Sequence, residues 1–204
     1  LGEDKITIPA PNSKETSEKS KQRHPLPHRY NSAELAEMKP NLPEGGDEFA
    51  GKGVLFRFET IGEIGSALEA LLSPSVASVV VHELARKCGM SLCKRIMEGT
   101  KTGEGALRHL CTLKSEENWG KLSFHDVDPE KGSGRVLITD SFETVARKRD
   151  QPSCHFFKGF LAGFLSKLFG KPITVVEEKC AAKGDERCEF RFADSLIFSA
   201  EEAK

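Results

Sequence analysis

The sequence predicts an α+β domain in which an antiparallel sheet packs against helices. Three observations support this prediction. Aromatic residues gather after residue 48, strand-like alternation occurs beside helical spacing, and the strand-like stretches of the second half come in pairs joined by turn-rich segments. Strands joined by short turns run antiparallel, so these pairs predict hairpins.

The 204 residues divide by composition into a tail and one domain. Residues 1–48 hold six of the ten prolines and none of the thirteen phenylalanines, so they cannot bury enough apolar surface to offset the entropy lost on ordering. We expect a flexible tail or linker at 1–48, with at most a helical turn at Ser32–Met38. The folded domain is expected at 49–198, followed by a short tail at 199–204. Because the chain begins with Leu1, we expect a processed product or a fragment.

The charge balance argues against nucleic acid as a direct partner. Thirty Lys and Arg stand against 31 Asp and Glu, which gives a net charge of −1 and no global attraction to a polyanion. No apolar run approaches the roughly 20 residues of a membrane span, and the N-terminus lacks the charged-then-apolar order of a signal peptide. We therefore expect a cytoplasmic protein without a membrane span.

One strand and three helices are predicted in the first half of the domain. Alternating apolar residues predict a strand at Val54–Glu59, and helical spacing predicts helices at Ile64–Leu72, Val76–Met97 and Glu104–Leu113. The second of these helices is expected to turn an apolar stripe with four-residue spacing toward the core. The stripe consists of Val76, Val80, Leu84, Cys88, Leu92 and Ile96.

Two hairpins are predicted in the second half. The first joins strands at Lys121–Val127 and Arg135–Thr139 through a turn rich in Gly and Asp. The second joins strands at Ile173–Glu177 and Cys188–Phe192, with Gly184 permitting a sharp reversal between them.

A predicted helix at 154–169 lies between the two hairpins and is the most apolar stretch of the chain. It carries Gly159 and Gly163 one turn apart. Helical glycines cost about 1 kcal/mol each relative to alanine, which favours a close approach by another element here. The phenylalanines of the helix either line a pocket or fill the core, and the residues alone leave both open. They are Phe156, Phe157, Phe160, Phe164 and Phe169.

Six cysteines occur, and the missing signal peptide favours a reducing compartment. Cys88, Cys93 and Cys111 lie in predicted helices and are interpreted as small buried hydrophobic residues. The other three accompany a carboxylate in a compact array, formed by Cys154, Glu177, Cys180 and Cys188.

This array could hold a metal ion, because thiolates fixed by turns at strand ends suit Zn²⁺. The spacing is not that of the familiar pair of cysteines two residues apart, so the residues alone leave a metal site and a group of buried thiols equally open. Glu178 and His155 are alternative ligands.

Residues 154–163 and 176–190 resemble the C-terminal signature of the 4-vinyl reductase domain family, an aromatic and glycine-rich helix followed by a glutamate and two cysteines. Related sensor domains of aromatic-responsive bacterial activators hold zinc with three cysteines and a glutamate in this order. The resemblance therefore implies zinc ligands at Cys154, Glu177, Cys180 and Cys188, within a zinc-bound C-terminal helix-hairpin unit. Vesicle-tethering subunits of the TRAPP complex are more distant relatives that hold a lipid chain.

The resemblance implies a regulatory domain that binds a hydrophobic or aromatic small molecule in an apolar cavity, and a homodimer. Phe157, Phe160 and Phe164 are the candidate ligand-binding residues. The phenol sensors of the family place a His and a Trp in the pocket, but His109 and Trp119 lie at other distances from the cysteine signature and do not take over that role.

Enzymatic activity is not expected, and no catalytic residue is predicted. The chain lacks a dinucleotide fingerprint and a nucleophile elbow, and a zinc ion with four protein ligands has no open position for water. Two alternatives remain: a dimeric scaffold of the same fold without a ligand, and a reductase accessory in tetrapyrrole metabolism.

Overall fold

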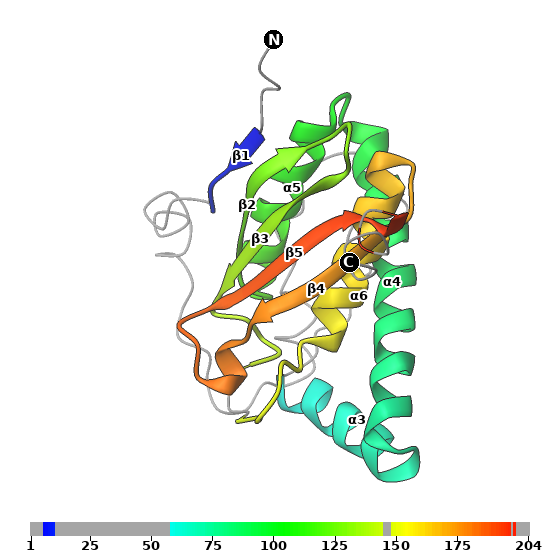
Figure 1. Ribbon diagram of the computed structural model, residues 1–204, viewed down its shortest axis with the longest axis vertical. Helices are drawn as coiled ribbons and strands as arrows, with labels where there is room; N and C mark the ends of the chain where they lie inside the picture. Colours follow the sequence, from blue (N-terminus) through cyan, green and yellow to red (C-terminus); the bar gives the residue numbers. More distant parts are fainter. Residues whose placement is uncertain (1–5, 11–57, 145–147, 197, 199–204) are drawn as a thin grey trace, which may run out of the picture. The chain divides into compact units, whose positions relative to one another are not determined.

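The computed structural model describes residues 6–10, 58–144, 148–196 and 198, whose core is one antiparallel sheet. Its strands follow the order β1-β2-β3-β5-β4 (Figure 1). They are β1 Ile6–Ile8, β2 Lys121–Asp128, β3 Ser133–Thr139, β4 Ile173–Lys179 and β5 Cys188–Asp194. The two predicted hairpins are confirmed, and β5 joins them by pairing with both β3 and β4.

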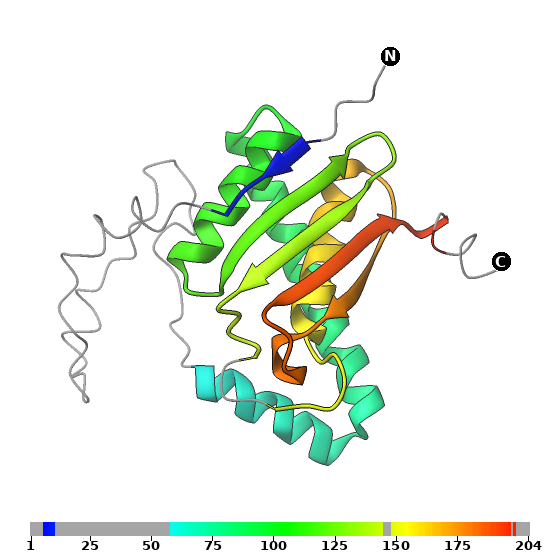
Figure 2. The same cartoon turned by 60° about the vertical axis from the view of Figure 1, so that its left-hand side comes forward.

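The helices cover one face of this sheet. They are α3 Phe58–Leu71, α4 Pro74–Gly99, α5 Gly103–Glu116 and α6 His155–Phe169, and a short 3₁₀ helix, η1, spans Ala181–Lys183. Helices α5 and α6 contact the sheet, and α4 packs on α6 (Figures 1 and 2). All residues from Gly159 to Leu165 are buried, because α6 lies between the sheet and α4. The described residues thus confirm the predicted α+β class.

Glycines let α4 and α6 approach each other closely, as the sequence predicted for α6. A Cβ at Gly159 would overlap the carbonyl oxygen of His82, and one at Gly163 would overlap that of Arg86. The contact is reciprocal, since a Cβ at Gly89 of α4 would overlap the carbonyl oxygen of Phe160. The two backbones therefore pack with almost no side chain between them at these points.

This close approach makes the predicted apolar stripe of α4 wrong in its first half. Leu92 and Ile96 are buried, but Val76, Val80 and Leu84 are 49%, 42% and 58% exposed, and Cys88 is exposed as well. The buried positions are instead mostly small: Ala77, Ala85, Gly89 and Cys93. A helix that approaches a neighbour through glycines needs small residues on its own contact face, so the valines and leucines turn outward.

Strand β1 was not predicted, because its residues belong to the segment expected to be a tail. Ile6–Ile8 pair with β2 at the edge of the sheet, and Ile8 is 1% exposed. A three-residue strand is too short to show a period in the sequence, and its order comes from pairing with β2. The helical turn expected at Ser32–Met38 and the tail at 199–204 lie outside the described residues.

The strand predicted at Val54–Glu59 is wrong where it can be compared. Phe58 and Glu59 are the first residues of α3, and residues 54–57 lie outside the described part of the chain. The helices predicted downstream are confirmed. The ends of α6 and η1 have the glycines that the sequence indicated, because Gly170 and Gly184 adopt left-handed φ angles of 67° and 108°.

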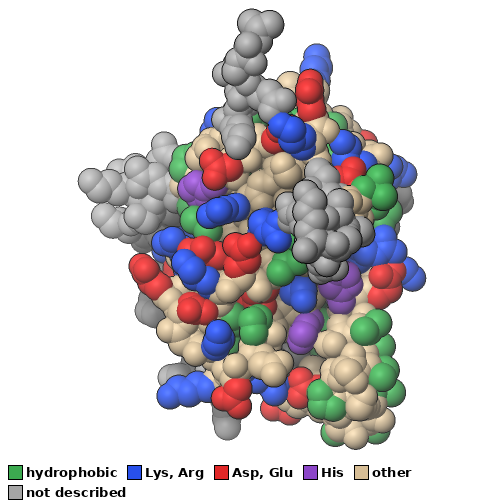
Figure 3. Space-filling view, in the orientation of Figure 1, with side chains coloured by type: hydrophobic (Ala, Val, Ile, Leu, Met, Phe, Trp, Pro, Cys, Tyr) green, Lys and Arg blue, Asp and Glu red, His purple; other side chains and the backbone are tan. Residues whose placement is uncertain are grey.

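The molecular surface has two contrasting regions in the view of Figure 3. Charged side chains of both signs cover the sheet face, where Lys179 and Arg187 pair with Glu189 and Arg191 pairs with Glu178. Hydrophobic side chains gather around the corner between α3 and α4 at the lower right. Within the described residues, we find no helix with the length and apolar character needed to span a bilayer.

Candidate metal centre and apolar cavity

Four side chains from three segments meet at the N-terminal end of α6. Cys154 is the residue that precedes the helix, Glu177 lies on β4, Cys180 precedes η1, and Cys188 begins β5. All four are buried, and their candidate ligand atoms lie within 4.8 Å of one another. The structure therefore brings together all the residues that the resemblance named.

The spacing of the sulfur atoms suits a tetrahedral ion better than a disulfide. The Sγ atom of Cys154 lies 3.8 Å from that of Cys180 and 3.6 Å from that of Cys188. A disulfide requires about 2.05 Å. Thiolates at the usual zinc–sulfur distance of about 2.3 Å stand about 3.8 Å apart in a tetrahedron.

Glu177 offers the fourth donor. Its Oε2 accepts a hydrogen bond from the backbone N–H of Cys154 at 3.0 Å, but its buried Oε1 has no hydrogen-bond partner. A buried carboxylate oxygen without a partner is costly, and a cation among the thiols would satisfy it. The donor set and this oxygen both fit a zinc ion.

The thiols of the cluster perturb one another strongly. The hydrogen bond between Cys154 and Cys188, together with burial, raises the pKa of Cys154, and the same hydrogen bond lowers the pKa of Cys188. Burial also raises the pKa of Cys180. Three thiolates and a carboxylate can share this volume only beside a positive charge, which again is the chemistry of a metal site.

The two alternative ligands are not part of the cluster. Glu178 is exposed and pairs with Arg191 at 3.0 Å on the outer face of the sheet. His155 is half-buried, and its pKa is lowered by burial and by Lys158. The set of grouped ligand atoms found among the described residues does not include it.

Polar contacts around the cluster fix the backbone that carries it. Asp185 Oδ2 accepts a hydrogen bond from the backbone N–H of Cys180 at 2.8 Å, and Cys188 Sγ accepts one from Ala181 at 3.4 Å. Glu143 accepts hydrogen bonds from the backbone N–H groups of Phe156 and Phe157 at 2.8 and 3.0 Å. Glu143 thus caps the start of α6, where a carboxylate complements the positive end of the helix dipole.

The remaining cysteines have the character expected of buried thiols, with one exception. Burial raises the pKa of Cys93 to about 11 and that of Cys111 to about 12, so both stay protonated. Cys88 is exposed, contrary to the prediction, because it lies on the outward side of α4.

The candidate ligand-binding phenylalanines lie in a packed aromatic cluster. Phe157, Phe160 and Phe164 are each at most 1% exposed. Trp119 lies against this cluster, with its ring centroid 5.4 Å from that of Phe156 and 5.3 Å from that of Phe160.

A buried lysine completes the aromatic cluster. The ammonium of Lys114 lies 3.6 Å from the Trp119 ring centroid and 2.6 Å from Glu117 Oε2. Burial lowers the pKa of Lys114, and the carboxylate of Glu117 opposes this effect. Sequence reasoning gave no sign of this pair or of the Glu143 cap, because neither has a recognisable spacing.

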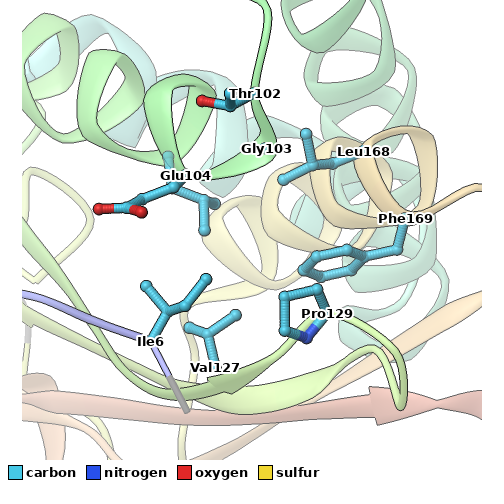
Figure 4. A pocket seen from close by; sticks show the side chains of 9 residues that line it. Ile6, Thr102, Gly103, Glu104, Val127, Pro129, Leu168 and Phe169 are labelled. Atoms are coloured by element: carbon cyan, nitrogen blue, oxygen red, sulfur yellow. The ribbon is translucent and has the colours of Figure 1, made fainter. Parts of the chain in front are cut away.

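A cavity of about 430 Å³ lies at the opposite end of α6. Its walls are largely apolar and come from β1, α5, β2 and α6 (Figure 4). Thr102, Gly103 and Glu104 form its polar side at the start of α5, and Glu104 is paired with Arg108. The apolar lining residues are Ile6, Leu107, Val127, Pro129, Leu168 and Phe169.

Comparisons with known proteins place the cysteine and glutamate cluster within a recognised domain. Residues 135–193 match the model of the 4-vinyl reductase domain family. MJ0150 of Methanocaldococcus jannaschii is 51% identical over 37 residues, which cover 18% of this chain and 21% of that protein. MJ0855 of the same organism is 37% identical over 73 residues, covering 34% and 32%. The chain thus spans about a third or less of these relatives.

Solved structures share the fold at low sequence identity. The phenol-responsive sensory domain of the transcription activator PoxR, solved with phenol, superposes with a TM-score of 0.66 at 20% identity, covering 74% of this chain and 81% of that one. A vinyl-4-reductase family protein from Methanocaldococcus jannaschii gives 0.50 at 16% identity, covering 70% and 84%. A trafficking protein particle complex subunit 3 from Naegleria fowleri, bound covalently to palmitic acid, gives 0.50 at 13%, covering 68% and 92%. The predicted resemblance to the 4-vinyl reductase domain family is thereby confirmed, with the family match extending from β3 to the end of the buried core at Ala193.

Proposed function

We propose that this chain is a zinc-containing regulatory domain that binds an uncharged apolar or aromatic molecule in the cavity between β1, α5, β2 and α6. The cavity carries the proposal. Its volume of about 430 Å³ falls within the range of small-molecule sites, and six of its nine lining residues are apolar. The structural likeness to a phenol-responsive sensory domain supports the same class of ligand.

The location differs from the one that the sequence favoured. Phe157, Phe160 and Phe164 fill the interior, whereas Leu168 and Phe169 from the last turn of the same helix line the cavity. We therefore assign ligand contact to Leu107, Val127, Leu168 and Phe169. The buried phenylalanines support α6 from within.

Zinc is proposed as a structural ion held by Cys154, Glu177, Cys180 and Cys188. An ion with four protein ligands has no open coordination position, so it would supply folding energy and no reaction chemistry. It would tie the start of α6 to the β4–β5 hairpin. Since the cavity is lined by the other end of α6, the metal would fix the helix that carries part of the ligand site.

Isothermal titration with 2-naphthol, an uncharged aromatic probe, tests the site. A Cβ at Gly103 would make only an ordinary contact with Leu168, so Gly103→Leu adds a side chain to the cavity without a backbone clash. We expect the native chain to bind the probe and Gly103→Leu to weaken binding by about tenfold or more.

Gly99→Leu is the matched control, because a Cβ at Gly99 has no atom within 4 Å and Gly99 does not line the cavity. It should bind the probe like the native chain. Absence of binding by the native chain would overturn the proposal, and undiminished binding by Gly103→Leu would place the probe elsewhere.

A homodimeric scaffold is the second candidate function, and the outward face of α3 and α4 favours it. Leu71, Val79 and Leu84 are 81%, 66% and 58% exposed, and Val76 lies between them at 49%. Exposed apolar patches of this kind mark contact surfaces. The carboxylates of Glu69 and Glu83 are already paired with Arg149 and Arg86, so a second copy would meet a largely neutral surface.

Native mass spectrometry separates the two candidates. Val79→Glu should convert a dimer to a monomer, whereas Val176→Glu, an equivalent change at a 38% exposed position on β4, should not. An apolar molecule that copurifies with the native chain supports the ligand-binding function. A dimer that carries no such molecule and does not bind 2-naphthol supports the scaffold.

A further inference from the structure

Strand β1 forms one wall of the cavity. Ile6 lies opposite Val127 in the pairing of β1 with β2, and both side chains border the cavity (Figure 4). Ile6 is half-buried, whereas Ile8, the next residue on the same side of the strand, is fully buried. Removal of β1 would therefore open the cavity on the side of Ile6.

The sheet holds this wall weakly. Strand β1 has three residues and lies at the edge of the sheet, where it pairs with β2 alone. The pairing is irregular, because Ile6 and Ile8 are two residues apart but their partners Val127 and Phe124 are three apart. Asp126, within this bulge of β2, has a left-handed φ of 53°. Bulges interrupt the hydrogen-bonded ladder, so β1 gains less from pairing than a regular strand would.

We propose that β1 is a movable wall, so that occupation of the cavity by an apolar molecule and docking of β1 on the sheet stabilise each other. Ordering three residues costs backbone entropy, and Ile8 is the only fully buried side chain in β1 that offsets it. A molecule in the cavity would add contacts to Ile6 that exist only when β1 is docked. A ligand that binds one state preferentially shifts the equilibrium toward that state, and the coupling is reciprocal.

This inference rests on the proposed ligand site, and it identifies β1 as the element through which occupancy reaches the N-terminal part of the chain. Hydrogen exchange of the full chain, read at peptides that cover residues 6–8, provides the test. Saturating 2-naphthol should slow exchange there about fivefold, while exchange in the central pair of β3 and β5 stays unchanged.

A variant tests the coupling without any ligand. The leucine of Gly103→Leu would occupy the cavity permanently, so exchange of β1 should slow in this variant, and it should not slow in Gly99→Leu. In the other direction, Ile6→Ser should weaken binding of 2-naphthol about fivefold. Thr7→Ser, a change at the exposed position of the same strand, should leave binding unchanged.

The outcomes distinguish the two proposals. Lack of 2-naphthol binding by the native chain overturns the proposed function, and the exchange of β1 in Gly103→Leu then decides on the wall alone. Binding with unaltered exchange of β1, and with native affinity in Ile6→Ser, overturns the movable wall and leaves the ligand site intact. A thermal melt of each variant checks that the core remains folded.

Discussion

The two ends of α6 differ in almost every physical respect. At the N-terminal end, four buried ligand atoms lie within 4.8 Å of one another, and Glu143 caps the helix. At the C-terminal end, Leu168 and Phe169 are half-buried and border a cavity of about 430 Å³. One end is closed and directional, and the other is open and apolar. The difference indicates that a rigidly held helix start can support an adaptable site about four turns away.

Replacing a residue of the closed end should have the largest effect. We expect Cys180→Ser to lose bound zinc and to lower the free energy of unfolding by at least about 3 kcal/mol, because it removes a ligand and leaves buried thiols without a cation. Metal analysis by mass spectrometry and urea denaturation measure the two quantities. Cys88→Ser, at an exposed thiol, is the control. Full zinc content with unchanged stability in Cys180→Ser would exclude the metal site.

A substitution in the middle of α6 tests whether its two ends depend on each other. In Gly163→Ala the new methyl group would overlap the carbonyl oxygen of Arg86, so α4 must move away. We expect the free energy of unfolding to fall by about 2–3 kcal/mol. If α6 acts as a rigid connection, zinc affinity and 2-naphthol affinity should fall together. A loss of only one of them would show that the ends are independent.

The helix cap should have a smaller effect that is confined to the closed end. Glu143→Gln keeps the shape of the side chain but removes the charge that faces the start of α6. We expect a loss of about 1 kcal/mol in the free energy of unfolding and a modest loss of zinc affinity. Binding of 2-naphthol should change little. An equal loss of both affinities would assign the cap a role along the whole helix.

The smallest effect on stability is expected at the open end. Leu168→Ala removes a half-buried side chain beside an existing cavity, so the free energy of unfolding should fall by only about 1 kcal/mol. The enlarged cavity should favour a larger aromatic probe over 2-naphthol in competition titrations. Unchanged selectivity would indicate that Leu168 does not contact the ligand.

The same contrast separates what the sequence could predict from what it could not. The hairpins, α6 and the four residues of the candidate metal centre were identified, because glycines, period-two alternation and a chemically distinctive array mark them locally. The orientation of α4 was not, since it depends on which side the glycines of α6 present to it. Strand β1 depends on pairing with a bulged partner, and the cavity depends on four elements that meet in space. Contacts of this kind have no signature in the order of residues.

Trp119 has a practical consequence, because it is the single tryptophan of the chain and lies against the first two turns of α6. Its indole emission should therefore serve as an intrinsic optical reporter of the closed end. The ammonium of Lys114 above the ring makes that emission sensitive to small displacements there. Removing metal with a chelator should shift the spectrum, whereas filling the cavity should not. One native chromophore thus allows the two ends of a helix to be followed separately in the unlabelled protein.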